Sequence, residues 1–209
     1  MDWYQLARQS GPYGLHIERN KLENTTRGIS LQDGAVGAVI TENEVLESWS
    51  TGIHFAYGGQ GHYVVSNTVR TTRGKGEGLI QGYLGINGMT IIGNRIESNG
   101  TPGQLFGIYI GPHCNDAYIA QNSVLGRYQK AAVGVDAAWV NSTSNPNTRH
   151  NSGNWDGYTS AGLQRCMITG NFVADQQGRA LRYSFTTAAA AAGGSTMYMD
   201  GKAVTPVNL

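Results

Sequence analysis

The sequence predicts an all-β fold in which short parallel strands coil into about six stacked rungs. The first observation is a unit that recurs six times, with a β-branched apolar residue three positions before an Asn and an apolar residue two positions after it. A unit that repeats in this way indicates a stacked architecture, because one unit cannot bury its apolar face and neighbouring units can. The Asn residues, separated by 23, 24, 27, 28 and 49 positions, are Asn20, Asn43, Asn67, Asn94, Asn122 and Asn171.

The second observation is the pattern that follows each Asn. A polar loop leads to a Gly and to another alternating run, as in Gly28–Leu31, Gly52–Phe55 and Gly107–Ile110. Alternation with a period of two is typical of strands, and no unit contains the roughly 10–12 residues of 3.6-residue periodicity that a helix needs. We therefore expect three short strands per turn, namely the run after the Gly, the run into the Asn and a short run after it.

The recurring Asn suggests a ladder. We expect each Asn to adopt the left-handed turn conformation and its side-chain amide to bond the amide one rung away. The alternative, that Asn is merely common in turns, leaves the shared register unexplained. From about Leu15 to Leu181 the chain resembles the right-handed parallel β-helix of the pectin-lyase-like superfamily, whose inner turn often carries a stacked Asn ladder. The resemblance implies a right-handed, single-stranded coil and is specific for fold rather than activity.

Composition excludes several function classes. The net charge of +1 gives no electrostatic reason to expect nucleic acid or anionic membrane as a partner. No apolar run approaches the ~20 residues of a membrane span, so no membrane insertion is expected, and the N-terminus lacks a signal-peptide pattern. No nucleotide loop, Cys/His metal cluster or Ser-nucleophile elbow is present, so we predict no cofactor and no metal.

The two cysteines, Cys114 and Cys166, form no redox or metal motif, and we expect both to be thiols. If Cys166 lies in a strand, its side chain points inward, with Met89 and Ala117 at the matching positions.

Three segments are predicted along the 209 residues. Residues 1–14 form an N-terminal cap or, as we favour, the continuation of a longer protein, since a bare first rung would expose a strand edge. Residues 15–185 form the β-helix, with a long loop over 136–163. Residues 186–209 form a linker and a hairpin, cap or trimerising tail, because Asp200-Gly201 lies between alternating residues as in a hairpin turn.

One outward face is predicted to be apolar. Stacked at the ~4.8 Å strand spacing, its residues would make a continuous stripe, and soluble monomers seldom expose large patches of this kind. We expect this stripe to pack around a threefold axis in a homotrimer; the alternative is that a loop or the C-terminal tail covers it. The predicted interface residues are Val39, Tyr63, Val65, Ile92, Tyr118 and Met167, with Ala120 beside them.

The resemblance implies polysaccharide as the ligand, and long carbohydrate sites use aromatic platforms and carboxylates. The polar loop between the short run after each Asn and the next Gly is called here the third-corner loop. The first candidate groove joins these loops to the outward residues of the Gly strands: Trp49, His54, Arg73, Glu77, Glu97 and Tyr109. The second joins the long loop to its rung: Asp136, Trp139, Trp155, Asp156 and Tyr158. Alternatively, Glu77 and Glu97 are solvated charges and the two loop tryptophans only pack the loop onto the coil.

Four of these carboxylates are candidate catalytic residues. Glu77 and Glu97 are expected on adjacent third-corner loops, whereas Asp136 and Asp156 share one insertion. Carboxylates on adjacent rungs would lie about 5 Å apart, near retaining geometry, and two rungs would give about 10 Å, near the upper end of inverting geometry.

The resemblance also limits the enzyme classes. The polygalacturonase set of Asn-Thr-Asp, Asp-Asp, Gly-His-Gly and Arg-Ile-Lys is absent, and Gly61-His62 is followed by Tyr63. No Asp cluster resembles the calcium site of a pectate lyase. The remaining branch is that of trimeric bacteriophage tailspikes and related surface proteins.

Three functions follow as expectations. The first is the β-helix portion of a tailspike-like virion protein that recognises bacterial surface polysaccharide. It would be located in the phage tail or extracellularly, with other virion proteins as further expected partners. The second is an active depolymerase, a glycosidase or lyase that uses paired carboxylates. The third is a structural spike or adhesin module that binds protein.

Overall fold

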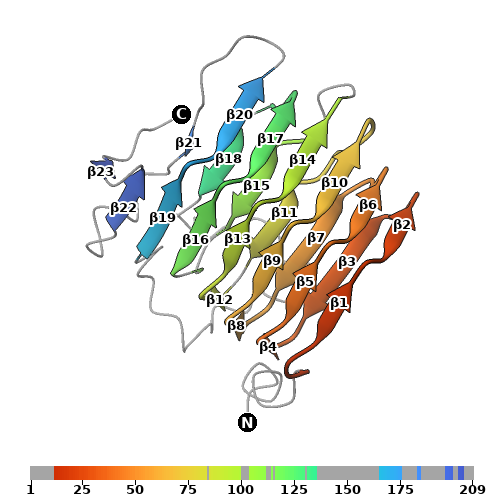
Figure 1. Cartoon of the computed structure of the whole chain (residues 1–209), viewed down its shortest axis with the longest axis horizontal. Helices are drawn as coiled ribbons and strands as arrows, with labels where there is room; N and C mark the ends of the chain where they lie inside the picture. Colours follow the sequence, from red (N-terminus) through yellow and green to blue (C-terminus); the bar gives the residue numbers. More distant parts are fainter. Residues whose placement is uncertain are drawn as a thin grey trace, which may run out of the picture.

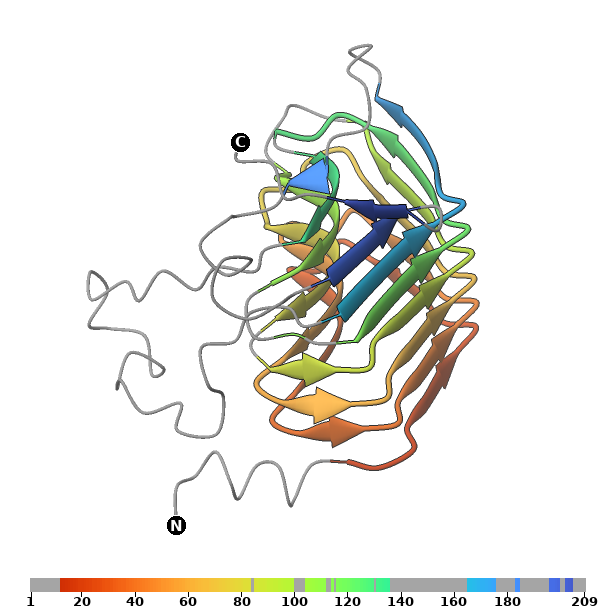
Figure 2. The same ribbon diagram turned by 90° about the vertical axis from the view of Figure 1, so that its left-hand side faces the viewer.

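The computed structural model describes residues 12–83, 85–99, 104–111, 114, 116–129, 131–135, 165–175, 183–184, 196–199 and 202–204. Within these residues the chain winds as a coil of short strands, each turn stacked on the previous one (Figures 1 and 2). Strands pair in parallel with their counterparts one turn away, as in His16↔Val39 and Val39↔Tyr63, and only the last described strand pairs antiparallel. The predicted all-β parallel β-helix is therefore confirmed. The described part of the chain contains no helix long and apolar enough to cross a membrane.

Four sheets run along the coil, and we name them by their place in each turn. The entry sheet leads into the Asn residues and contains β1 (His16–Glu18), β5 (Val39–Thr41), β9 (Tyr63–Val65), β13 (Thr90–Ile92), β16 (Ala117–Ala120), β19 (Arg165–Thr169), β22 (Thr196–Met199) and β23 (Lys202–Val204). The exit sheet follows the Asn residues and contains β2 (Lys21–Glu23), β6 (Glu44–Leu46), β10 (Thr68–Thr71), β14 (Arg95–Ser98), β17 (Ser123–Gly126) and β20 (Phe172–Asp175).

The other two sheets close each turn. The glycine sheet contains β3 (Arg27–Gln32), β7 (Thr51–Ala56), β11 (Gly78–Tyr83), β15 (Phe106–Ile110), β18 (Ala131–Val135) and β21 (Tyr183–Ser184). The corner sheet contains β4 (Ala35–Val36), β8 (Gly59–Gln60) and β12 (Ile86–Asn87). The expectation of three strands per turn was therefore incomplete, because a two-residue strand forms between the glycine and entry strands of the first turns.

The number of rungs and the end of the repeat differ slightly from the prediction. Only three of the described turns carry all four strands, fewer than the six expected rungs. The exit and glycine sheets nevertheless hold six strands each, and the entry sheet continues to β22. The backbone repeat thus extends past Leu181, where the sequence pattern stops: β21 pairs with β18, and β22 pairs with β19. At the C-terminal end, β22 and β23 pair antiparallel through Met197↔Val204, while Asp200 and Gly201 of the predicted hairpin turn lie outside the described residues.

The core fills the tube with branched aliphatic side chains. The apolar residue before each Asn and the one after it point inward; Ile40 and Val45, for example, are fully buried. The glycine sheet contributes a third inward column that includes Ile53 and Ile80. Because each fully buried side chain of this size contributes about 1.5–3 kcal/mol, the stacked columns are the main source of stability.

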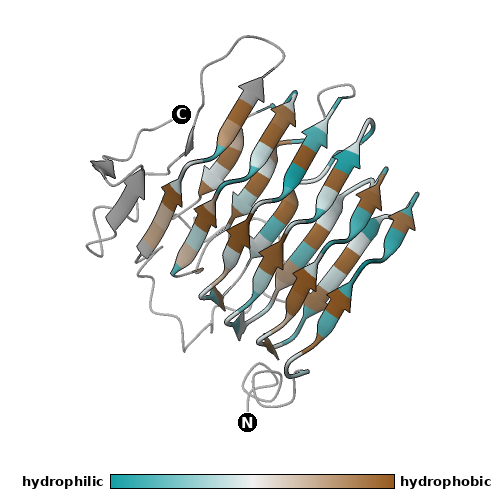
Figure 3. Cartoon of the chain, in the orientation of Figure 1, coloured by the Kyte–Doolittle hydropathy of each residue, from teal (hydrophilic) through white to brown (hydrophobic). Residues whose placement is uncertain are grey.

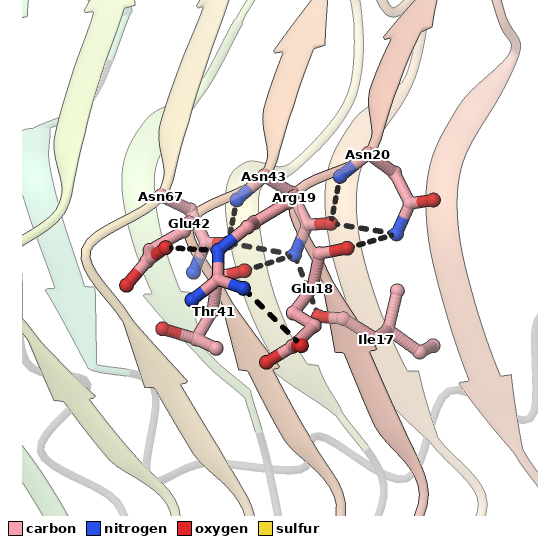
Figure 4. Close-up of polar contacts among 8 residues, drawn as sticks. All are labelled: Ile17, Glu18, Arg19, Asn20, Thr41, Glu42, Asn43 and Asn67. Atoms are coloured by element: carbon pink, nitrogen blue, oxygen red, sulfur yellow. Dashed lines mark hydrogen bonds and ion pairs between the residues drawn. The ribbon is translucent and has the colours of Figure 1, made fainter.

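The Asn ladder is confirmed (Figure 4). The Asn43 backbone N–H and side-chain Nδ2 donate to Asn67 Oδ1 at 2.9 and 3.0 Å. The same Nδ2 also donates to the carbonyls of Thr41 and Ile17, at 3.0 and 2.8 Å. This pattern links the six residues of the ladder in sequence, from Asn20 through Asn43, Asn67, Asn94 and Asn122 to Asn171.

The left-handed residue of this turn is not the Asn, which corrects our expectation. None of the six ladder Asn residues has a positive φ; the residue before each of them does, with φ between 55° and 65° at Arg19, Glu42, Ser66, Gly93, Gln121 and Gly170. The preceding residue turns the chain, and the Asn then uses its backbone and side-chain groups for bonds along the coil. The Arg19–Glu42 ion pair at 2.8 Å joins two of these turn residues, but both side chains are exposed, so it contributes little.

Candidate functional site

The first candidate groove is only partly formed, and its accessible part surrounds Trp49. Trp49 lies in the loop between β6 and β7, and its side chain is 52% exposed. The loop backbone continues the ladder of the sheets: Trp49 N–H donates to the Thr25 carbonyl at 2.9 Å, and Lys75 N–H donates to the Trp49 carbonyl at 2.8 Å. A Cβ on Gly76 would lie 2.0 Å from the Ser50 carbonyl oxygen, so neighbouring loops stack closely. The exposed indole is therefore held on a rigid base.

A network of charged and polar side chains reaches the indole through Arg73. The Arg73 guanidinium carbon lies 5.3 Å from the centroid of the Trp49 ring, its Nε lies 3.8 Å from Glu47 Oε2, and Nη2 donates to the Asn24 side-chain oxygen. Glu47 Oε2 also accepts from the Thr72 N–H and hydroxyl, at 3.1 and 2.8 Å. We call these five residues, from three adjacent turns, the Trp49 platform. Trp49 and Arg73 were predicted for the groove; Asn24, Glu47 and Thr72 were missed.

Two other predicted sugar contacts are buried, which corrects the first groove. His54 points outward from the tube, but it is 5% exposed, and its Nδ1 lies 3.2 Å from Ser30 Oγ. Burial, together with the charge of Arg27, lowers the pKa of His54 to about 4. Tyr109 is also 5% exposed and stacks on Phe106 with ring centroids 4.9 Å apart. Strand alternation gave their direction correctly, but it does not report whether the outer side of a sheet is covered.

The candidate catalytic glutamates do not share the expected corner. Glu97 lies within β14, where its register partners are Arg70 and Leu125, and its Oε1 accepts from Arg95 Nη2 at 2.7 Å. Glu77 precedes β11 in the glycine sheet, and its Oε2 accepts from Gln81 Nε2 at 2.7 Å. Glu77 therefore lies in the loop just before a glycine-sheet strand, whereas Glu97 lies within an exit-sheet strand. Glu97 is largely buried, so it is not the solvated surface charge of the alternative interpretation.

The second candidate groove lies outside the described residues. Its members Asp136, Trp139, Trp155, Asp156 and Tyr158 all fall between positions 136 and 164. The catalytic and sugar-binding roles given to them remain predictions.

The strands of the entry sheet are rich in apolar residues (Figure 3), and the residues of the predicted stripe lie in register along them. One column contains Val39, Tyr63, Thr90, Tyr118 and Met167, and the next contains Val65 and Ile92. Tyr63, Met167 and Tyr118 are 49%, 45% and 36% exposed. Ala120, next to Ile92 in the second column, is buried, so it does not extend the exposed stripe.

One interior column contains three side chains with nitrogen or sulfur atoms, together with one alanine. His62, Met89, Ala117 and Cys166 occupy one inward column of the entry side, as the backbone bonds and the Ala117↔Cys166 pair indicate. The inward position predicted for Cys166 is thereby confirmed, and neither cysteine forms a disulfide. Burial raises the pKa of both thiols to about 12, and the nearby Cys114 contributes to the shift at Cys166.

His62 is the unusual member of this line. The side chain is fully buried, its ring lies 4.4 Å from that of Phe55, and neither ring nitrogen has a hydrogen-bond partner. Burial lowers the pKa of His62 to about 4. In the sequence, His62 stands out only as a departure from the Gly-His-Gly motif, and the signal that marks it as an inward residue is its position two residues before the buried Val64.

Comparisons with known proteins give one family. A family model described as "Periplasmic copper-binding protein (NosD)" matches residues 8–178, which is most of the chain. The comparisons with curated proteins and with solved structures found no match.

Proposed function

Because the chain belongs to the NosD family, and with it to the pectin-lyase-like parallel β-helices, we propose that it acts outside the cytoplasm as a rigid binding module for polysaccharide. The family description names the periplasm, so the proposed setting is extracytoplasmic rather than a phage tail, and the tailspike resemblance is left without support from the comparisons. The fold alone does not define a ligand. The observation that carries the proposal is the Trp49 platform.

The chemistry of the platform suits a sugar. A half-exposed indole offers an apolar surface for the C–H face of a pyranose ring, and Trp combines large contact area with little conformational freedom. Glu47 accepts and Arg73 donates beside it, so hydroxyl groups or an acidic sugar find both kinds of partner. The loop backbones are already fixed by bonds between turns, which reduces the ordering cost of binding.

We expect Trp49→Ala to weaken binding of the chain to its bacterial surface polysaccharide by at least about tenfold, the usual effect of losing an aromatic anchor. The measurement is calorimetric titration with purified capsular and O-antigen polysaccharides, after a glycan array has identified a binder. Phe172→Ala is the matched control, because Phe172 is 64% exposed and lies in β20, three strands beyond β10 in the exit sheet and outside the apolar stripe. Equal affinities of the two variants, or no glycan binding by the unmodified chain, would contradict the proposal.

The described residues do not favour the depolymerase alternative. The carboxylate of Glu97 is held by Arg95, and that of Glu77 by Gln81. Release of reducing ends from a bound polysaccharide, lost in Glu77→Gln, would establish an activity that the Trp49 platform does not require. If the chain is instead a structural spike or adhesin module that binds protein, neither the unmodified chain nor its variants should bind any polysaccharide tested.

We also propose that copies of this chain pack against one another as a homotrimer through the apolar stripe of the entry sheet. Ile92 lies near the middle of the stripe, so Ile92→Glu should convert the oligomer to monomer in sedimentation equilibrium while leaving the circular dichroism spectrum unchanged. Thr68→Glu, on the outer face of the exit sheet, is the control and should remain oligomeric. A monomeric parent chain would reject the trimer.

The copper in the family description raises the question of whether this chain has suitable ligands. The described residues contain no group of three His, Cys, Asp or Glu side chains that could hold a metal ion. They do contain the sulfur atoms of Met89, Cys114 and Cys166, all buried on one side of the tube. Thioether and thiolate sulfur select monovalent copper, whereas carboxylate and water suit harder ions. Met89 and Cys166, however, lie two turns apart in one inward column with Ala117 between them, so the described residues do not form a site that fits the copper of the family description.

A further inference from the structure

We infer that one end of the coil docks a second copy of this chain through the free edges of β1 and β2. Within the described residues, β1, β2 and β3 are each the terminal strand of their sheets, and they lie together at one end of the coil (Figure 1). An unpaired strand edge is a template on which another strand can pair. This end surface shares no residue with the Trp49 platform or with the apolar stripe.

The core is incomplete at this end. Ile17 and Leu22 are the counterparts of Ile40 and Val45 one turn above, and both pack against the core. Ile40 and Val45 are fully buried, whereas Ile17 and Leu22 are only half-buried, because no described strand pairs with β1 or β2 on the other side. A further layer of strands would complete the burial of both side chains, which is favourable.

The Asn ladder is also open at this end (Figure 4). The side-chain oxygen of Asn43 accepts from the backbone N–H and the Nδ2 of Asn20, both at 3.0 Å. The side-chain oxygen of Asn20 accepts no hydrogen bond from the described residues, and water can reach it because Asn20 is exposed. A docked pair of strands that brings N–H groups to this corner would replace that water.

The strands β1 and β2 are complementary to each other when they run antiparallel. Each has one inward apolar residue, Ile17 or Leu22, between two exposed residues. A continuous core requires Ile17 of one copy to lie opposite Leu22 of the other. A slip of one residue would turn every side chain to the wrong face. A slip of two residues would place Ile17 opposite Asn20 or Asn24, so a single register remains.

The outward side chains match in that same register. Glu18 of each copy lies opposite Lys21 of the other, and His16, a hydrogen-bond donor, lies opposite Glu23. In the single chain, Lys21 has only a 3.9 Å contact with Glu44, and no described residue forms an ion pair with Glu23. Opposite charges on directly opposed residues stabilise a strand pair, and like charges destabilise it. Charge complementarity therefore favours a second copy as the occupant.

The geometry of the coil allows both strand pairs to form together. A two-fold axis through the Asn20 corner, perpendicular to the coil, makes the facing strands antiparallel and pairs β1 with β2 and β2 with β1. The same axis maps the helical rise of one end onto that of the other, so the two edges meet along both strands. Every contact then occurs twice, as in an isologous dimer, and the two coils lie end to end.

The contact is small, because each copy contributes two strands of three residues. Interfaces of this size are typical of weak association, so we expect a dissociation constant in the upper micromolar to millimolar range. The test is small-angle X-ray scattering of Ile92→Glu, in which the stripe is disrupted, from micromolar to millimolar concentration. The maximum dimension should approach twice that of the monomer as the concentration rises. If the unmodified chain is monomeric, it is used in the same way.

Charge reversal tests the register. We expect Glu18→Lys or Lys21→Glu alone to weaken association about tenfold, because each substitution creates two like-charged pairs in the symmetric contact. The double variant exchanges the charges and should associate to within about threefold of its parent. Arg70→Glu is the matched control, since Arg70 is exposed in the exit sheet two strands beyond β2, and it should leave association unchanged.

Scattering that remains monomeric up to millimolar concentration would overturn the end-to-end dimer. A dimer without the doubled dimension would also overturn it, because the copies would then lie side by side. A double variant that associates no better than the single variants would show that Glu18 and Lys21 do not face each other. Polysaccharide binding is measured separately with Trp49→Ala, and none of these results alters it.

Discussion

Replacing Asn67 by Ala should lower the free energy of unfolding by about 4 kcal/mol, a cost reached only by loss of a buried network. The side chain of Asn67 accepts from the backbone and side chain of Asn43, at 2.9 and 3.0 Å. Its Nδ2 donates to Asn94 Oδ1 and to the carbonyls of Ile40 and Val65, at 3.0, 2.9 and 3.1 Å. Ala would leave these partners buried and without a bond, and each unsatisfied group costs about 1–3 kcal/mol. Urea denaturation followed by circular dichroism measures the change.

The ladder provides its own control. Asn20 stands at its lower end and is exposed, so water can replace the bonds that Asn20→Ala removes, and we expect a loss of about 1 kcal/mol. The fourfold difference between two identical substitutions comes from position in the stack, because bonded amides in a low-dielectric interior reinforce one another. Equal costs at Asn20 and Asn67 would mean that the amides act only as independent turn residues.

The stacking of the coil could be predicted from sequence because its signals are local. Ile40, Asn43 and Val45 fall within six residues, and the same pattern recurs in every turn. The left-handed residue was assigned wrongly because conformational propensity favours Asn, whereas Arg, Glu, Ser and Gln occupy four of the six left-handed positions. Those residues tolerate the conformation because the stacked bonds of the neighbouring Asn fix the turn.

The candidate sites were harder to predict because they depend on contacts between turns and on what lies outside the tube. Alternation places His54 and Tyr109 outward, and it cannot indicate that both are buried there. Glu47 joins the Trp49 platform because its φ of 54° turns the chain at the end of β6, which the residue type does not suggest. Cys114 and Cys166 are separated by 52 positions in the chain, and only the stacking of turns places them on neighbouring turns of the buried interior.

Acidification from pH 7 to pH 4 should destabilise the fold by about 6 kcal/mol, about 3 kcal/mol from each of His54 and His62. Burial holds the pKa of both rings at about 4, compared with the ordinary 6.5 of an unfolded chain. As the pH falls through 6.5, the unfolded chain binds two protons that the folded chain does not. Stability is therefore complete above pH 6.5, is lost progressively below it, and stops falling on account of these rings near pH 4. Urea midpoints at half-unit pH intervals measure this slope.

The two histidines can be separated, because only one has a partner. His54 bonds Ser30, whereas both nitrogens of His62 are buried without one beside Phe55. His62→Leu should therefore halve the slope between pH 6.5 and 4.5 and also raise stability at pH 7, since an apolar side chain removes two unsatisfied groups from the core. His54→Gln should halve the slope without that gain at neutral pH. An unchanged slope in His62→Leu would show that the ring is already protonated or solvated in the folded chain, and the packed interior around it would then have to open to water.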